Sequence, residues 1–378
     1  MPTTLGSITS TGNLKLNTVE SYEINDFSQG QVLWDVPGSY FWVVPPTVTS
    51  VSGICIGAGG SSVSADSTGF SGSGGGGGGG LAWGNINVTP GEQLQIVVGR
   101  GGTATTAAVS SSPTQGQFGG NSFVQRANAQ IVLQGGGGGP GLAPNTVLSP
   151  GGFGGISSGT NRTGGGVGGN GGTVTGDFQG GGGGGGAGGY FGIGGQGGNV
   201  AASTGVNGGN PAAGGGGGGG GGSGSGANIG GAAGGGVGIY GAGADGAGGP
   251  AITVAGTNSG GGIGGSGGTN GANVTIRGGY GGNFGGGGGG CPDDTGSSPA
   301  PCNGGNGGVR IVWGPNRWYP NVANVANITT MYSVPPVNSV NVAAFYSSEF
   351  NELATLPAGT VQRINGNIWY INGELVEI

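Results

Sequence analysis

The chain has 378 residues, of which 111 are glycine, 8 are basic and 14 are acidic, and it contains no histidine. The formal charge of −6 excludes the basic surface that nucleic acids require, and it disfavours an anionic membrane face as a partner. No apolar run reaches the roughly 18 residues of a membrane span. The start of the chain lacks the basic and apolar regions of a signal peptide, so we expect synthesis in a cytoplasm and release by lysis.

The first third of the chain has the pattern of β-strands, after a segment at 1–30 that we expect to serve attachment. Short runs rich in β-branched and aromatic residues alternate with turn residues, and no run has a helical period with caps. The sequence therefore predicts an all-β fold, with an antiparallel β-sandwich over 31–134 that is completed by 309–314. The expected strands are 31–36, 39–44, 48–56, 94–98, 122–126 and 130–133.

Residues 135–308 are dominated by glycine and carry a period of three. Two glycines precede each residue with a side chain in 165–173, 194–199, 264–269, 278–283 and 304–309. Three is the period of the polyproline II helix, whose N–H and C=O groups point outward and can bond to neighbouring helices. Ordering glycine costs about 1–2 kcal/mol per residue, so only dense bonding between helices can hold such a segment. We predict a packed array of polyglycine II helices instead of the flexible linker that glycine-rich composition alone indicates.

The two ends of this array are expected to be fixed in the sandwich. The run 309–313 reads as a strand directly after the last repeat, and we expect it to pair with strands of 31–134. The glycine-rich region is then one large insertion in the sandwich. In 315–378 glycine is sparse, and two Asn-Gly pairs flank an aromatic run, which predicts a small C-terminal β-meander.

The three cysteines predict no metal site. Cys55 lies in an alternating apolar run and reads as a small core residue. Cys291 and Cys302 bracket a loop with three prolines, and the sequence leaves open whether they form a disulfide or remain two free thiols. A disulfide there would stabilise the fold by roughly 2–3 kcal/mol.

Catalytic signatures are missing from the sequence, and we expect neither an enzyme nor a cofactor. The absence of histidine excludes a Ser-His-Asp triad, and the cysteines lack zinc-site spacing. The Gly-x-Gly-x-x-Gly matches follow from composition and have no βαβ context. Asp293 and Asp294 are adjacent, so they read as a solvated loop, with a calcium-ligand role as the alternative.

Several segments together resemble a known family. They are 38–51, the run before Leu81-Ala82-Trp83, 88–99, and 304–314. In order and content they are similar to the glycine-rich tail-fibre and adhesin proteins of tailed bacteriophages, of the marine myovirus type. The resemblance implies a virion structural protein, a tail fibre or fibre-tip adhesin that takes part in host attachment. It implies other tail or fibre proteins as partners, and a bacterial outer-membrane protein or surface glycan as receptor.

Aromatic residues that interrupt the glycine field are the candidates for receptor binding. A large side chain cannot enter a packed glycine array, so we expect these residues on its outer face or at helix ends, where they can stack on sugars or dock on a protein loop. The alternative is that they pack on each other to seal the array. The candidates are Tyr190, Phe191, Tyr240, Tyr280 and Phe284.

Other functions stay open beside the adhesin. The main alternative is a purely structural spacer or decoration protein of the virion without receptor contact. An enzyme that attacks host polysaccharide, a cellular adhesin and an ice-binding protein are less favoured. A homotrimer is compatible with a fibre, although no heptad repeat supports it.

Overall fold

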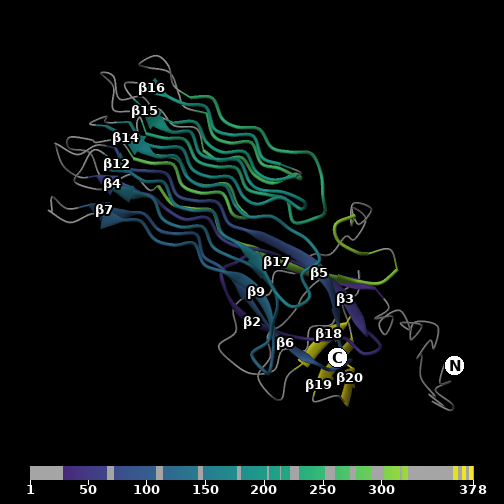
Figure 1. The fold of residues 1–378 in the computed structure, drawn as a ribbon. Coiled ribbons are helices and arrows are strands. Elements are labelled where there is room, and N and C mark those ends of the chain that lie inside the picture. The colour runs from purple at the N-terminus through teal and green to yellow at the C-terminus, as the bar shows by residue number, and fades with distance from the viewer. Residues whose placement is uncertain are drawn as a thin grey trace, which may run out of the picture.

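The computed structural model describes strands and extended glycine-rich segments, and no helix occurs in the part of the chain that it describes. Figure 1 shows a strand-rich body from which a long bundle of extended segments runs side by side. The expected all-β fold is therefore confirmed. The described residues are 29–65, 72–107, 114–143, 148–176, 180–201, 204–212, 214–221, 230–251, 260–272, 278–291, 302–315, 317–321, 361–364, 368–371 and 374–377.

Two antiparallel sheets form the strand-rich body. The first has the order β1-β17-β3-β5, and the second has the order β13-β10-β9-β6-β2. Between them lies a core in which the indoles of Trp34 and Trp313 contact that of Trp42, with ring centroids 6.4 and 5.7 Å apart. The strands are β1 Gly30–Trp34, β2 Gly38–Val43, β3 Ser50–Ile56, β5 Leu81–Asn87, β6 Gln93–Val98, β9 Ser122–Arg126, β10 Ile131–Gly135, β13 Ser157–Ser158 and β17 Gly308–Trp313.

Strand β17 anchors the return of the chain from the glycine-rich region. It pairs with β1 on one side, Ile311 opposite Val32, and with β3 on the other, Val309 opposite Cys55. The predicted pairing of 309–313 with the N-terminal strands is thus confirmed. Since β3 leads directly into the first glycine segment and β17 follows the last, the first and last segments of the array are joined to the same sheet.

Backbone hydrogen bonds in the array repeat every three residues. The N–H groups of Gly75, Gly76 and Gly77 donate to Gly172, Gly288 and Gly139, which lie on three different segments, at 3.0, 2.8 and 2.9 Å. The next three glycines repeat the order on the same three segments, with donations to Gly169, Gly285 and Gly136 at 2.9, 2.7 and 2.8 Å. Each of these three accepting segments is therefore antiparallel to 72–80, and every third residue faces the same one.

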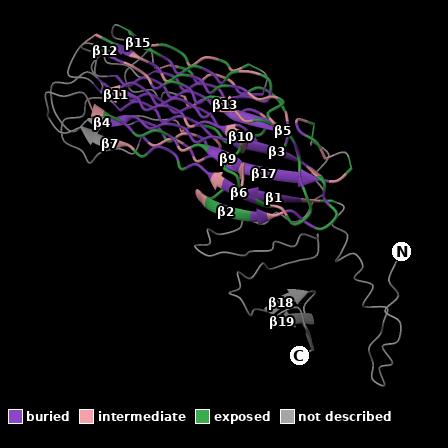
Figure 2. Ribbon diagram, turned by 60° about the horizontal axis from the view of Figure 1, so that its bottom comes forward, coloured by how far each residue is buried: buried purple, intermediate pink, exposed green. Residues whose placement is uncertain are grey.

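The inner segments of the array are surrounded on all sides. Segment 72–80 exchanges backbone hydrogen bonds with six others, which are 57–62, 136–142, 150–155, 166–172, 182–188 and 285–291. Segment 182–188 likewise bonds to six, which are 73–79, 169–172, 195–198, 216–219, 232–235 and 287–290. Figure 2 shows this interior as buried ribbon. The fully buried segments are 57–62, 72–80, 181–188, 214–221, 230–236 and 285–290.

The array begins earlier in the chain than the predicted boundary at residue 135. Segments 57–62, 72–80, 99–104 and 116–121 lie within the region expected to be sandwich alone, yet they bond to the glycine segments as the later ones do. The sandwich and the array thus alternate along the chain. At the junction, where the strands of the sandwich meet the array, β3, β6 and β10 continue directly into array segments, and β5, β9 and β17 directly follow them.

Asparagine side chains complete the hydrogen bonding at the perimeter. An outer segment lacks a neighbour on one side, so some of its N–H groups have no backbone acceptor within reach. The Oδ1 atom of Asn170 accepts from Gly154 N at 2.8 Å, and that of Asn199 accepts from Thr173 N at 2.8 Å. The same role is taken by Asn121, Asn207, Asn210, Asn270, Asn303 and Asn306.

Short strands mark the far end of the array. Figure 1 places β4, β7, β12, β14, β15 and β16 together at the end farthest from the sandwich. They pair as β4 with β7, as β8 with β11, and as a sheet of order β12-β14-β15-β16. Their bounds are β4 Val63–Ala65, β7 Thr105–Ala107, β8 Thr114–Gln115, β11 Leu142–Ala143, β12 Leu148–Ser149, β14 Val174–Thr175, β15 Val200–Ala201 and β16 Thr204–Gly205.

The C-terminal strands form a separate antiparallel meander. Strands β18 Val361–Ile364, β19 Ile368–Ile371 and β20 Glu374–Glu377 pair in that order. The aromatic strand β19 is central, as the two flanking Asn-Gly pairs predict. The proposed attachment segment at 1–30 lies outside the described residues except for 29 and 30.

Candidate functional site

Tyr190 was expected on the outer face of the array or at a helix end, and it lies just after the end of segment 181–188, where it is buried and not exposed. Its side chain has no exposed area and lies between the array and the first sheet. The hydroxyl donates to Gly238 O at 2.9 Å and accepts from Gly241 N at 3.0 Å, while the ring stacks on Tyr319. Burial, with Tyr319 as a second cause, raises the pKa of Tyr190 well above its usual range. The chain reverses direction at Tyr190, next to the sandwich, and the apolar residues of the sheet there can accommodate a large ring that the glycine interior cannot.

A buried cation lies beside this ring. Arg310, which is 1% exposed, projects from β17 and donates from Nε to Gln31 Oε1 at 3.0 Å and from Nη1 to Tyr319 Oη at 3.0 Å. Its guanidinium carbon lies 4.9 Å from the ring centroid of Tyr240. Burial raises the pKa of Tyr319 to about 12 even though Arg310 acts in the opposite direction. The cluster binds the turn at 239–242 to the sheet, and it presents no open site.

Two further candidates belong to the same junction. Tyr240 is 45% exposed, but one face of its ring covers the Arg310 guanidinium. Phe284 is half-buried against the apolar cluster that contains Tyr190 and Tyr319, and it has a positive φ of 62°, as the chain turns there from one array segment to the next. Both residues therefore seal the near end of the array, which was the alternative left open by the sequence.

Phe191 and Tyr280 do lie on the outer surface, where they were expected. They are 62% and 52% exposed. Phe191 contacts the Trp83 ring edge to face, with ring centroids 6.2 Å apart. Tyr280 lies on a perimeter segment, where its carbonyl accepts from Ala272 N at 3.0 Å. The five aromatic candidates are thus not brought together in one site.

The far end offers a surface that sequence reasoning missed. Leu148, Thr175 and Ala201 are opposite one another across β12, β14 and β15, and all three are exposed. The alternate row of Ser149, Val174 and Val200 is wholly buried. One face of this small sheet is buried, and the other is exposed. The strands of such a sheet are about 4.8 Å apart. Two-residue strands carry too little pattern to be predicted from sequence.

A disulfide between Cys291 and Cys302 closes the chain at the same end. Both residues are buried, and their Cα atoms are 6.6 Å apart. Ser73, also buried, accepts from Cys291 N through its hydroxyl at 2.8 Å and hydrogen-bonds to Ser62 at 2.9 Å. The far end is therefore tied by covalent and polar contacts. Asp293 and Asp294, the loop carboxylates considered as calcium ligands, lie outside the described residues.

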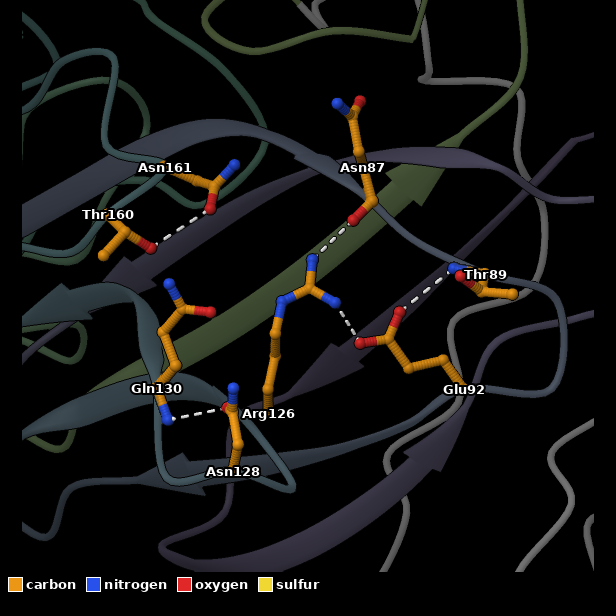
Figure 3. Close-up of polar contacts among 8 residues, drawn as sticks. All are labelled: Asn87, Thr89, Glu92, Arg126, Asn128, Gln130, Thr160 and Asn161. Carbon is orange, nitrogen blue, oxygen red and sulfur yellow. Dashed lines mark hydrogen bonds and ion pairs between the residues drawn. The ribbon is translucent and has the colours of Figure 1, made fainter.

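The polar residues at one end of the sandwich hold turns in place (Figure 3). Arg126 on β9 forms an ion pair with Glu92 and donates to Asn87 O, which links β9 to the turn between β5 and β6. Thr89 N donates to the other carboxylate oxygen of Glu92 at 3.0 Å. Among the described residues this is the one ion pair found. The ion pair and the hydrogen bonds around it stabilise the turn between β5 and β6.

Cys55 is a free, buried thiol of the sandwich core, as expected. Burial raises its pKa above the usual range of a thiol. In the described part of the chain, no three cysteine or acidic side chains come together to hold a metal ion. Nor does that part contain a helix suited to crossing a membrane.

Comparison with known proteins identifies the domain type. A family model described as a glycine-rich domain matches residues 35–255, which is more than half of the chain and spans both sandwich and array. No curated protein matches the chain.

Proposed function

Because the chain belongs to the glycine-rich domain family over residues 35–255, we propose that it is a rigid display protein whose far end contacts a partner. We further propose that it serves as the adhesin of a phage tail fibre, in keeping with its resemblance to such proteins. The observation that carries the proposal is the six-neighbour bonding of the inner segments, with one end of the array joined to the sandwich and the other far from it.

The hydrogen bonding between segments explains how a glycine-rich chain can be rigid enough to hold its far end in a fixed place. We propose that the segments are polyglycine II helices, in which a rise of about 3.1 Å per residue gives 72–80 a length of about 28 Å. Glycine has no side chain to hold such a rod straight, so neighbouring rods must do it. The far-end sheet is then presented at a fixed distance and angle from the sandwich.

The open row of Leu148, Thr175 and Ala201 is the part of the far end that we assign to receptor contact. It combines apolar and hydroxyl groups and lacks charge. Such a surface suits the apolar faces of sugar rings or an uncharged protein loop. Tyr280, on a perimeter segment of the array, and Phe191, beside Trp83 of the sandwich, are secondary candidates.

Binding of the purified protein to intact candidate host cells tests this assignment, with competition for phage adsorption as a second readout. We expect the protein to bind and to reduce adsorption, and we expect Leu148→Asp and Thr175→Arg each to weaken binding by about tenfold, the factor that ~1.4 kcal/mol produces. Ile263→Asp is the matched control, because Leu148 and Ile263 are 47% and 49% exposed but only Leu148 lies at the far end.

The outcomes separate the adhesin from the structural alternative. If the protein enters virions but neither binds cells nor competes, receptor contact is abandoned and the spacer role remains. If binding survives the two far-end variants but is lost in Tyr280→Ala, the contact lies on the side of the array.

A further inference from the structure

Within the part of the chain that the structure describes, the sandwich has one sheet edge that is long, uncharged and open. The edge strand β5 is covered, since Thr163 N donates to Trp83 O at 2.9 Å and Leu81 N donates to Gly166 O at 2.9 Å. The edge strand β13 has only two residues, and the last four residues of β1 are buried. Strand β2 has six residues and pairs only with β6 among the described strands. In Figure 2 it lies at the margin of the described body, away from the array.

The backbone groups on the free side of β2 can be identified. Val44 N donates to Glu92 O at 2.9 Å, and Val44 O accepts from Gly91 N at 2.9 Å, so this residue points both groups toward β6. Backbone direction alternates along an antiparallel strand. Ser39, Phe41 and Val43 therefore direct their N–H and C=O groups to the open side. No backbone partner for them appears in the part of the chain that the structure describes.

Natural edge strands are usually protected by charge, bulges or proline, and β2 has none of these within its length. Its sequence is GSYFWV, and Phe41 is 43% exposed. Pro37 precedes it, and Pro45 and Pro46 follow it, so the open edge is bounded at both ends. Such an edge is suited to one added strand of limited length.

We propose that the open edge of β2 pairs with β2 of a second copy of this chain, giving an antiparallel dimer. With the twofold axis at Phe41, each Phe41 is opposite its counterpart, and Ser39 is opposite Val43 of the other copy. These residues are the ones whose backbone groups face outward, so the register forms hydrogen-bonded pairs throughout. Two aromatic rings then meet on the exposed face, and no like charges oppose each other.

A second copy fits this edge because the pairing is self-complementary and closes on itself. The described part of the sandwich has one such edge, so an isologous contact between two copies uses both edges and ends at the dimer. The two sheets become one continuous sheet. The two arrays then project from a common base and offer two far ends.

Light scattering of the full-length protein over a dilution series tests the proposal. We expect a mass of twice the 35.3 kDa of one chain, falling toward one chain on dilution. Phe41→Lys should weaken association by about tenfold or more, since each copy loses an aromatic partner and gains a like charge at the axis. Val43→Pro should have a similar effect, because it removes an outward N–H that β6 does not use.

Gln93→Lys is the matched control. It adds the same charge at an exposed position opposite Val43, but on the interior strand β6. The proposal requires that this variant stays dimeric and that all three variants keep the circular dichroism spectrum of the parent. A parent protein that is monomeric at every concentration overturns the proposal. So does a dimer that survives both Phe41→Lys and Val43→Pro.

Discussion

Replacing Gly78 by alanine tests the close packing of the array at one of its innermost positions. A methyl group on Gly78 would lie 2.0 Å from Gly186 O and 2.5 Å from Gly186 C. Carbon and oxygen normally approach no closer than roughly 3.3 Å, so one segment must move by more than an ångström. Gly186 cannot yield easily, because its N–H donates to Gly195 O at 2.8 Å and its carbonyl accepts from Gly169 N at 2.8 Å.

The cost follows from these contacts. Forcing an extra methyl into a packed interior costs about 1–3 kcal/mol, and weakening one buried hydrogen bond adds about 1 kcal/mol. Alanine also lowers the conformational entropy of the unfolded chain, which offsets roughly 0.4–1 kcal/mol of this cost. We therefore expect Gly78→Ala to lower the free energy of unfolding by about 2–3 kcal/mol. Buried alanines such as Ala232 and Ala233 show that a methyl is accepted only where neighbouring backbones leave room.

Guanidinium unfolding followed by circular dichroism measures this difference. Gly209→Ala is the matched control, since its methyl would meet nothing closer than Gln196 N at 3.0 Å and the position is half-buried on the perimeter. We expect the control to change the free energy of unfolding by less than about 0.5 kcal/mol. Equal stability of the parent and Gly78→Ala would refute the reasoning.

Three other predictions follow from single contacts. Asn170→Ala should cost about 1–2 kcal/mol in chemical unfolding, because it leaves the buried Gly154 N–H without its acceptor, whereas the exposed Gln196→Ala should cost little. Thiol titration should find no reactive cysteine in the native protein, one after unfolding, which is Cys55, and three after reduction. Since burial raises the pKa of Tyr319 to about 12, the contribution of its neutral form to the free energy of unfolding is complete below pH 10. About 3 kcal/mol should then be lost as the pH rises from 10 to 12, and Tyr319→Phe should reduce that loss.

Two sequence signals predicted most of the fold: the period of three, which predicts packed glycine segments, and the strand pattern directly after the last repeat. A side chain at every third residue allows two glycine faces for neighbours, and the strand at 309–313 had to pair with something. The start of the array was missed because segments such as 57–62 and 116–121 are short and stand between clear strands. Averaged over a longer stretch of sequence, their composition is dominated by the flanking strands, so they were assigned to the sandwich.

The candidate site was harder to predict than the fold. The sequence indicated correctly that large rings stay out of the glycine interior, but it could not distinguish an exposed ring from one at the junction. Tyr190 is buried because sheet residues such as Ile54 and Leu81 form an apolar surface beneath the chain reversal. Asparagine after two glycines, as at Asn170 and Asn306, was a readable signal for perimeter acceptors, since only such positions need one.

Hydrogen–deuterium exchange of the full-length protein tests the rigid array most directly. We predict that amides in 73–80 and 182–188 exchange as slowly as those in the buried part of β3, because each of these array amides is hydrogen-bonded and buried. Perimeter amides that depend on asparagine should exchange faster. Complete exchange of 73–80 and 182–188 at the rate of an unfolded chain would contradict the account, since no rod could then hold the far end in place.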